Sequence, residues 1–146
     1  MLLIGLSSGC GDGRPRRVPV SGQVLIDGKP LRSGYVRVVP ENSRAAQGNI
    51  DQNGRFQLTT FDDGDGCVPG THPLEVSSCE KAGPSAVRWL IPKEYQDAAT
   101  SGLTVTVKEP TDSLLIQLSW KGGRPFVEQL DSQGDGGDPT RETPGR

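Results

Sequence analysis

The chain is poor in the residues on which most catalytic and metal sites depend. Among its 146 residues there is one histidine, His72, and there are three cysteines with no CxxC pair. A tetrahedral zinc site needs four such ligands at suitable spacing. Phosphate loops, dinucleotide fingerprints and HExxH are also absent. A catalytic triad would have to use His72, which precedes Pro73 inside a predicted strand. We therefore expect no enzyme, no cofactor and no zinc site.

The chain also has few hydrophobic residues, few aromatic residues and no long run of basic ones. Hydrophobic residues make up 32%, with two Trp, two Tyr and three Phe, and the formal net charge is −2. No apolar run approaches the roughly 20 residues of a membrane span. The basic cluster Arg14, Arg16 and Arg17 is short, so we interpret it as a solvated linker and expect no nucleic-acid partner.

Glycine and proline are abundant, at 20 and 12 residues. This density interrupts a chain too often for long helices. The middle of the chain is instead rich in Val, Leu, Ile and Thr, which favour strands. A thin core built from alternate positions of two facing sheets fits this composition.

The N-terminus, MLLIGLSSGC, places small residues between an apolar stretch and Cys10. This order resembles the end of a lipoprotein signal peptide, which implies that Cys10 is the lipid anchor and residues 1–9 are the remnant of the signal. The stretch lacks the basic start of a complete signal, so we expect the true start upstream of Met1. The alternative is a cytosolic N-terminus with a stray cysteine. Residues 10–17 are expected to form a flexible tether, and the protein to lie in the cell envelope, facing the periplasm or the exterior.

From Val18 the apolar residues alternate with a period of two, as in a half-buried strand. Asp27-Gly28 and Asn53-Gly54 are strong turn signals, and the second predicts a hairpin between its flanking strands. The pattern predicts seven antiparallel strands, over Val18–Ile26, Tyr35–Val39, Ala46–Asp51, Arg55–Thr60, Thr71–Ser78, Leu103–Val107 and Ser113–Ser119. The predicted fold class is an all-β, seven-stranded Greek-key β-sandwich over residues 18–120.

Two segments are predicted to lie outside the strands. The connection over residues 79–102 is expected to be a loop with one short helical turn, held over the end of the sandwich by Trp89, Ile91 and Tyr95; a binding site is the alternative. Residues 121–146 are rich in glycine and proline, and we predict a disordered tail.

The segments VSGQVLIDGKPLRSGYVRVVPE, DQNGRFQLTTF and DGDGCVPGTHPLEV, with the later IPKEYQDAATSGLTVTVKEPTDSLLIQL, resemble small bacterial lipoproteins that carry a transthyretin-like, carboxypeptidase-regulatory-like domain. The resemblance covers about residues 18–118. It implies a prealbumin-like sandwich and an exported setting, and it carries no catalytic residues to transfer. Cys67 and Cys79 depart from the pattern, and at Cys67 a small or apolar residue is usual.

Two further sites can be weighed on spacing. Cys67 and Cys79 flank the predicted strand 71–78, whose length of over about 20 Å exceeds the Cα separation that a disulfide allows, so we expect no bridge. The loop with Asp62, Asp63 and Asp65 could offer Ca²⁺ its carboxylates, but it lacks the EF-hand spacing. We expect a solvated turn there and no metal.

The sequence thus predicts an envelope-anchored, non-catalytic binding or structural module that contacts its partner through loops or a strand edge. The partner is the membrane through Cys10, together with an envelope protein or a glycan; the low aromatic content favours the protein. The alternatives are a calcium-dependent adhesion module and an accessory domain of a hydrolytic system, both using the Asp62–Asp65 loop.

Overall fold

The computed structural model describes residues 13–130, and over this range the protein is all-β. Its one helical element is a short 3₁₀ helix, η1 (Lys93–Gln96). The eleven strands are β1 (Val20–Ile26), β2 (Lys29–Pro30), β3 (Tyr35–Val38), β4 (Ala46–Asn49), β5 (Arg55–Gln57), β6 (Gly70–Ser77), β7 (Cys79–Gly83), β8 (Ala86–Trp89), β9 (Thr104–Val107), β10 (Thr111–Leu118) and β11 (Phe126–Gln129).

The first sheet is built around β1. Strand β10 pairs with β1 in parallel, and β2 and β5 pair with it antiparallel. The β1–β2 turn has positive φ at both Asp27 (48°) and Gly28 (80°), which defines the type I′ hairpin turn that the sequence indicates. The prediction that all strands are antiparallel is wrong for β1 and β10, because the chain crosses between sheets before it returns beside β1.

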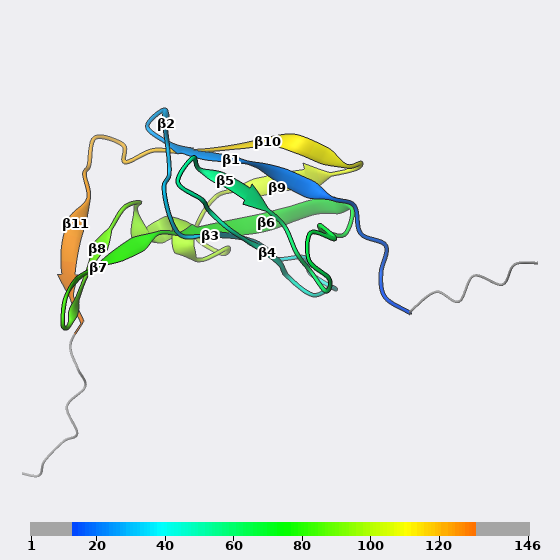
Figure 1. Cartoon of the computed structure of the whole chain (residues 1–146), viewed down its shortest axis with the longest axis horizontal. Coiled ribbons are helices and arrows are strands. Elements are labelled where there is room, and N and C mark those ends of the chain that lie inside the picture. The colour runs from blue at the N-terminus through cyan, green and yellow to red at the C-terminus, as the bar shows by residue number, and fades with distance from the viewer. Residues whose placement is uncertain (1–12, 131–146) are drawn as a thin grey trace, which may run out of the picture.

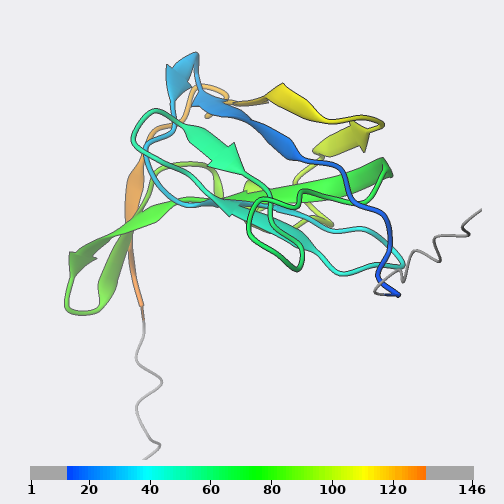
Figure 2. The same ribbon diagram turned by 45° about the vertical axis from the view of Figure 1, so that its right-hand side comes forward.

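The second sheet has the order β4-β3-β6-β9, with every neighbouring pair antiparallel. Figures 1 and 2 show β1 and β10 in one layer and β3, β6 and β4 in the other. Buried side chains of both sheets form one core, which includes Val24 and Ile116 from the first sheet and Val36, Leu74 and Val76 from the second. The alternation along residues 18–26 is confirmed, since positions 18, 20, 22 and 24 are buried and position 26 is half-buried.

The turn at Asn53-Gly54 is present, but the hairpin predicted around it is wrong. Strand β4 pairs with β3, whereas β5 pairs with β1 in the other sheet. One isolated bridge links Gln47 of β4 to Thr59, in the segment that follows β5. A turn signal is local, whereas the strand with which each flanking strand pairs depends on how both of its faces are buried in the tertiary structure.

A third, three-stranded sheet with the order β11-β8-β7 corrects two predictions. The connection 79–102 contains the β7–β8 hairpin in addition to the helical turn, and residues 126–129 of the predicted tail form β11, at the end of the domain away from the described N-terminal residues (Figure 1). Ile91 and Tyr95 pack in the main core as expected, and Trp89 is also buried. Residues 131–146 lie outside the described residues.

One carboxylate fastens β11 to the rest of the domain. Glu128 accepts hydrogen bonds from Trp89 Nε1 at 2.6 Å and from Lys93 Nζ at 2.9 Å. The bond from Lys93, and then the one from Trp89, holds the pKa of Glu128 below its ordinary value. Strand pairing alone gives a short edge strand little stability, so these bonds explain why β11 stays paired.

Removal of this carboxylate is expected to loosen β11 alone. In Glu128→Ala the amides of residues 126–129 should exchange with solvent faster, while those of β3 and β6 keep their wild-type rates. The matched control is Glu80→Ala, which removes an exposed ion pair with Arg88 in the same sheet. Hydrogen exchange followed by mass spectrometry measures the difference, and equal exchange in the two variants would contradict the assigned role.

None of the helices that the structure describes is long and apolar enough to span a bilayer.

Candidate functional site

The candidate site is a polar groove on the outer surface of the second sheet. It has a volume of about 650 Å³ and lies between strands β3 and β4 and the segment that follows β5. Its lining is mostly polar and comprises Arg37, Arg44, Ala45, Gln47, Gly48, Asn49, Gln57, Thr59, Thr60, Phe61 and Asp63. We call this set the polar groove.

Strand alternation places the polar side chains in the groove. In β4 the residues at 46 and 48 are buried, so Gln47 and Asn49 point to solvent. Gly48 lets the next segment approach closely, because a Cβ there would lie 2.3 Å from the carbonyl oxygen of Gln57. Gln47 and Thr59 then exchange two backbone hydrogen bonds of 2.9 Å. The polar faces of β4 and of the segment after β5 therefore form one continuous surface.

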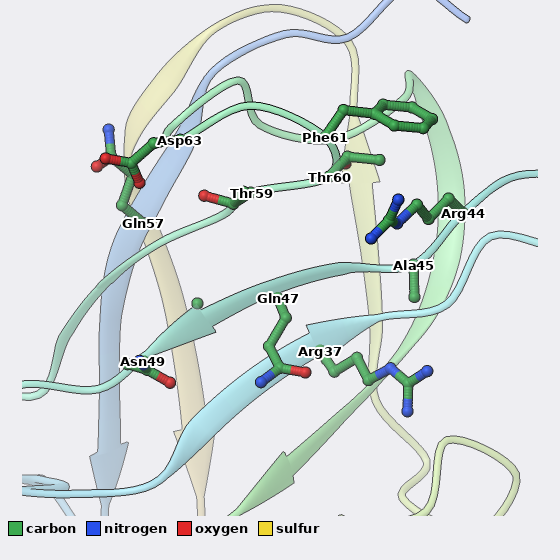
Figure 3. A pocket seen from close by; sticks show the side chains of 11 residues that line it. Arg37, Arg44, Ala45, Gln47, Asn49, Gln57, Thr59, Thr60, Phe61 and Asp63 are labelled. Atoms are coloured by element: carbon green, nitrogen blue, oxygen red, sulfur yellow. The ribbon is translucent and has the colours of Figure 1, made fainter. Parts of the chain in front are cut away.

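Three side-chain amides on this surface are free for a ligand. Among the described residues, no protein group forms a hydrogen bond with the side chains of Gln47, Asn49 or Gln57. Figure 3 shows Gln57 and Asp63 at one end of the groove and Phe61 with Arg44 at the other. Each free amide has donors and an acceptor, so the groove can bind groups that both give and take hydrogen bonds.

Arginines surround the ring of Phe61 at one end of the groove. The guanidinium carbons of Arg14, Arg17 and Arg44 lie 4.8, 5.0 and 5.3 Å from the ring centroid, within the range of cation–π attraction. Arg17 also pairs with Asp65 at 2.8 Å. The interpretation of residues 10–17 as a flexible tether is therefore wrong for Arg14 and Arg17, whose side chains pack on the domain through contacts that no local pattern reveals.

Arg44 differs from Arg14 and Arg17 in the ion pairs that the described residues form. Arg14 pairs with Asp62 at 3.2 Å, and Arg37 in the groove lies 3.5 Å from Glu75. Within residues 13–130, no ion pair includes Arg44. The Arg44 guanidinium, packed on the Phe61 ring at one end of a groove that also holds free amides, is a suitable site for a carboxylate or another oxyanion.

The acidic loop beside the groove is organised by Asp65. Its carboxylate accepts hydrogen bonds from the backbone N–H groups of Thr60, Phe61 and Asp62, at 2.7, 3.1 and 3.1 Å. Burial raises the pKa of Asp65, but the three backbone bonds and the Arg17 charge outweigh it and hold the pKa below its ordinary value. Asp65 thus fixes the backbone that carries Phe61.

The other two aspartates of the loop have different surroundings. Asp62 is exposed and pairs with Arg14, and Asp63 lines the polar groove. Within the described part of the chain, no three His, Cys, Asp or Glu side chains lie together in a way that could hold a metal ion. Asp65 directs its oxygens to the loop's own N–H groups.

The remaining candidate residues do not converge on the groove. A ring nitrogen of His72 forms a hydrogen bond with the carbonyl oxygen of Val68 at 3.0 Å. Cys67 and Cys79 are both free; Cys67 is buried in the core and Cys79 is exposed. Cys10 lies outside the described residues.

The two free cysteines are expected to differ sharply in reactivity. Burial raises the pKa of Cys67 to about 11, and the thiolate is the nucleophile. In the full chain with Cys10→Ser, Cys67 should react with a disulfide reagent at least about a hundredfold more slowly than Cys79 until the protein is unfolded. Reaction of both thiols at one rate in the native protein would show that Cys67 is not in the core.

The comparisons with known proteins identify no relative: no protein-family model matches the chain, and neither a curated protein nor a solved structure is significantly similar to it.

Proposed function

We propose that the protein is an envelope-anchored lipoprotein whose β-domain binds an acidic glycan in the polar groove and performs no chemistry on it. The observation that carries this proposal is the groove itself: among the described residues its three side-chain amides have no hydrogen-bond partner, and Arg44, which no described ion pair includes, lies at one end of it. Sugars present hydroxyl groups that both donate and accept hydrogen bonds, and a uronic or similar acid adds the carboxylate that an arginine binds well.

The lining favours a glycan over a protein partner. Protein interfaces have an apolar core with buried aromatic or aliphatic anchors. Among the groove residues only Ala45 and Phe61 are apolar, and arginines lie over the Phe61 ring. The low aromatic content that argued against a sugar concerns stacking, whereas this groove offers hydrogen bonds and charge.

The lining also favours binding without catalysis. Asp63 is the one carboxylate in the groove, and the lining includes no histidine, cysteine, serine or lysine. Glycoside hydrolysis ordinarily requires two carboxyl groups on opposite sides of the scissile bond. A lone exposed carboxylate supplies neither that pair nor an activated nucleophile.

We also propose a fold for the domain: a Greek-key sandwich of the transthyretin-like, carboxypeptidase-regulatory-like kind. Strands β2, β7, β8 and β11 are additions to its seven strands. Two sheets that share one core support it.

The proposed anchor is a lipid on Cys10. In cells, a palmitate analogue should label the full-length gene product and fail to label Cys10→Ser; absence of label on the wild type would refute the anchor.

Ligand binding is tested with a soluble uronic-acid polysaccharide and its carboxyl-reduced, neutral counterpart. The full chain with Cys10→Ser should bind the acidic polymer more tightly than the neutral one. Arg44→Ala should weaken binding of the acidic polymer by about tenfold or more, the value of one charge-assisted hydrogen bond. The matched control Arg124→Ala removes an exposed arginine outside the groove lining and should bind like the wild type. Equal binding of both polymers, or equal losses in the two variants, would contradict the proposal.

A further inference from the structure

The two ends of the polar groove carry charges of opposite sign. Figure 3 shows Arg44 with Phe61 at one end and Asp63 with Gln57 at the other. Within residues 13–130, no ion pair includes Arg44 or Asp63. From this separation of charge we infer that the ligand is a zwitterionic oligosaccharide, whose acidic sugar lies at Arg44 and whose free amino group lies at Asp63. The inference rests on the binding function proposed for the groove and adds the second charged group of the ligand.

Among the described residues, one arginine at the positive end has no carboxylate partner. Arg14 and Arg17 lie over the Phe61 ring with Arg44, and Figure 3 shows Arg37 on the same side of the groove. The other three arginines form ion pairs, Arg14 with Asp62, Arg17 with Asp65 and Arg37 with Glu75. Each of these carboxylates weakens the field of its own arginine at a ligand, so Arg44 is the guanidinium of this end that best binds an anion.

A tight turn positions Asp63 at the negative end. The carbonyl oxygen of Asp62 accepts the N–H of Asp65 at 2.9 Å, and the N–H of Gly64 donates to Thr59 Oγ1 at 2.9 Å. Gly64 has a φ of +70°, a turn conformation that glycine adopts without steric cost. Because hydrogen bonds hold the residues on both sides of Asp63, its exposed carboxylate is presented at a fixed place, and a ligand need not order the loop in order to bind there.

The basic side chain of β5 is directed away from this end. Arg55 and Gln57 are both exposed in β5, but the Arg55 guanidinium donates a hydrogen bond to the carbonyl oxygen of Asp112, in β10, at 3.0 Å. Arg55 is also outside the groove lining. The side chain of Gln57, in contrast, lies against the turn, since a Cβ on Gly64 would come within 2.8 Å of its Nε2 atom. The negative end therefore consists of the Asp63 carboxylate and a neutral amide.

A ligand with both charges matches this arrangement better than the alternatives do. A neutral glycan leaves both charged groups without a partner, and a polyanion brings a second negative charge to Asp63, which repels it. A ligand that carries a carboxylate and an ammonium group pairs with both ends, and its hydroxyl groups meet the free amides between them. Strand β4 runs between the two ends, and its first and last Cα atoms are about 10 Å apart. The two charged groups of the ligand therefore belong to different sugar rings.

Calorimetric titration with two matched oligosaccharides tests the inference. One has a uronic acid at one end and a free hexosamine at the other, and the second is its N-acetylated form. At about pH 6, where the carboxylate is ionised and the amine protonated, the full chain with Cys10→Ser should bind the free amine about tenfold more tightly, the value of one charge-assisted hydrogen bond. Asp63→Asn should remove this preference. The matched control Asp112→Asn makes the same change in net charge at an exposed residue outside the groove lining, and it should keep the preference.

The direction of the bound ligand has its own test. A nitroxide attached to the hexosamine end should broaden the side-chain amide signal of Gln57 more than the Nε signal of Arg44. Equal affinity for the two oligosaccharides, a preference that survives in Asp63→Asn or is lost equally in Asp112→Asn, or stronger broadening of the Arg44 signal would each overturn the inference. In those cases the proposed function still stands if binding depends on Arg44. Absence of binding by both oligosaccharides, or binding that Arg44→Ala leaves unchanged, would overturn the proposed function and the inference together.

Discussion

Replacement of Gly66 by alanine is expected to destabilise the domain by about 3 kcal/mol, since a backbone in the left-handed region and a steric clash add together. Gly66 has a φ of +88°, and a Cβ there would lie 1.8 Å from the carbonyl oxygen of Val18. That carbonyl accepts the N–H of Cys67 at 3.0 Å, which ties the first described residues to the acidic loop. An added methyl group must therefore separate the two segments.

Gly122→Ala provides the control for backbone conformation alone. Gly122 has nearly the same φ, +86°, and nothing lies within 4 Å of a Cβ placed there. Gly122→Ala should therefore reduce the free energy of unfolding by only about 1 kcal/mol. Urea unfolding of the two variants measures the difference, and similar losses in both would show that the loop does not approach Val18 as described.

Replacement of Asp65 by asparagine is expected to lower the free energy of unfolding by about 2 kcal/mol. An asparagine keeps the size of the side chain but loses the charge that binds Arg17 and one of the two acceptor oxygens, and hydrogen bonds to charged groups contribute about 1.5–3 kcal/mol each. The side chains of Asp65 and Arg17 are only 13% and 14% exposed, so water replaces these bonds poorly. The control is Asp62→Asn, at an exposed ion pair of little expected value.

Asp65 should also make the stability of the domain depend on pH. Because the folded pKa of Asp65 is depressed, its contribution is fully present above the unfolded pKa of about 3.9 and is lost as the pH falls through the lower, folded value. The wild type should therefore lose stability in acid, and Asp65→Asn should lose less of it. Parallel pH curves for wild type and variant would contradict the role given to this carboxylate.

Local patterns predicted the strands whose two faces differ. The seven predicted segments all contain observed strands, because each alternates core and solvent positions. Strands β2, β7, β8 and β11 were not predicted: β2 is two residues long and β8 four, and for β7 and β11 there is a further physical reason. Most of β7 is exposed, the side chains of β11 are mostly exposed, and neither contributes to the main core. Strands of this kind carry no burial pattern, and pairing with β8 determines them.

The polar groove could be predicted from the sequence only in part. Asp63 was recognised within an acidic loop, but Arg44, Gln47 and Asn49 are ordinary surface residues in sequence. They become a site because β4 and the segment after β5, which belong to different pairings, meet at the Gln47–Thr59 bridge. Gly48 permits that approach, and a glycine inside a predicted strand is the one sequence signal for a close backbone contact.

The most direct test of the account is a titration of the labelled full chain, with Cys10→Ser, by a uronic-acid oligosaccharide, followed by NMR of the side-chain amides. Ligand binding in the groove predicts that the amide signals of Gln47, Asn49 and Gln57 and the Arg44 Nε signal shift together and saturate at one affinity. Binding that leaves these four signals unmoved, or shifts that the neutral oligosaccharide reproduces equally, would contradict it.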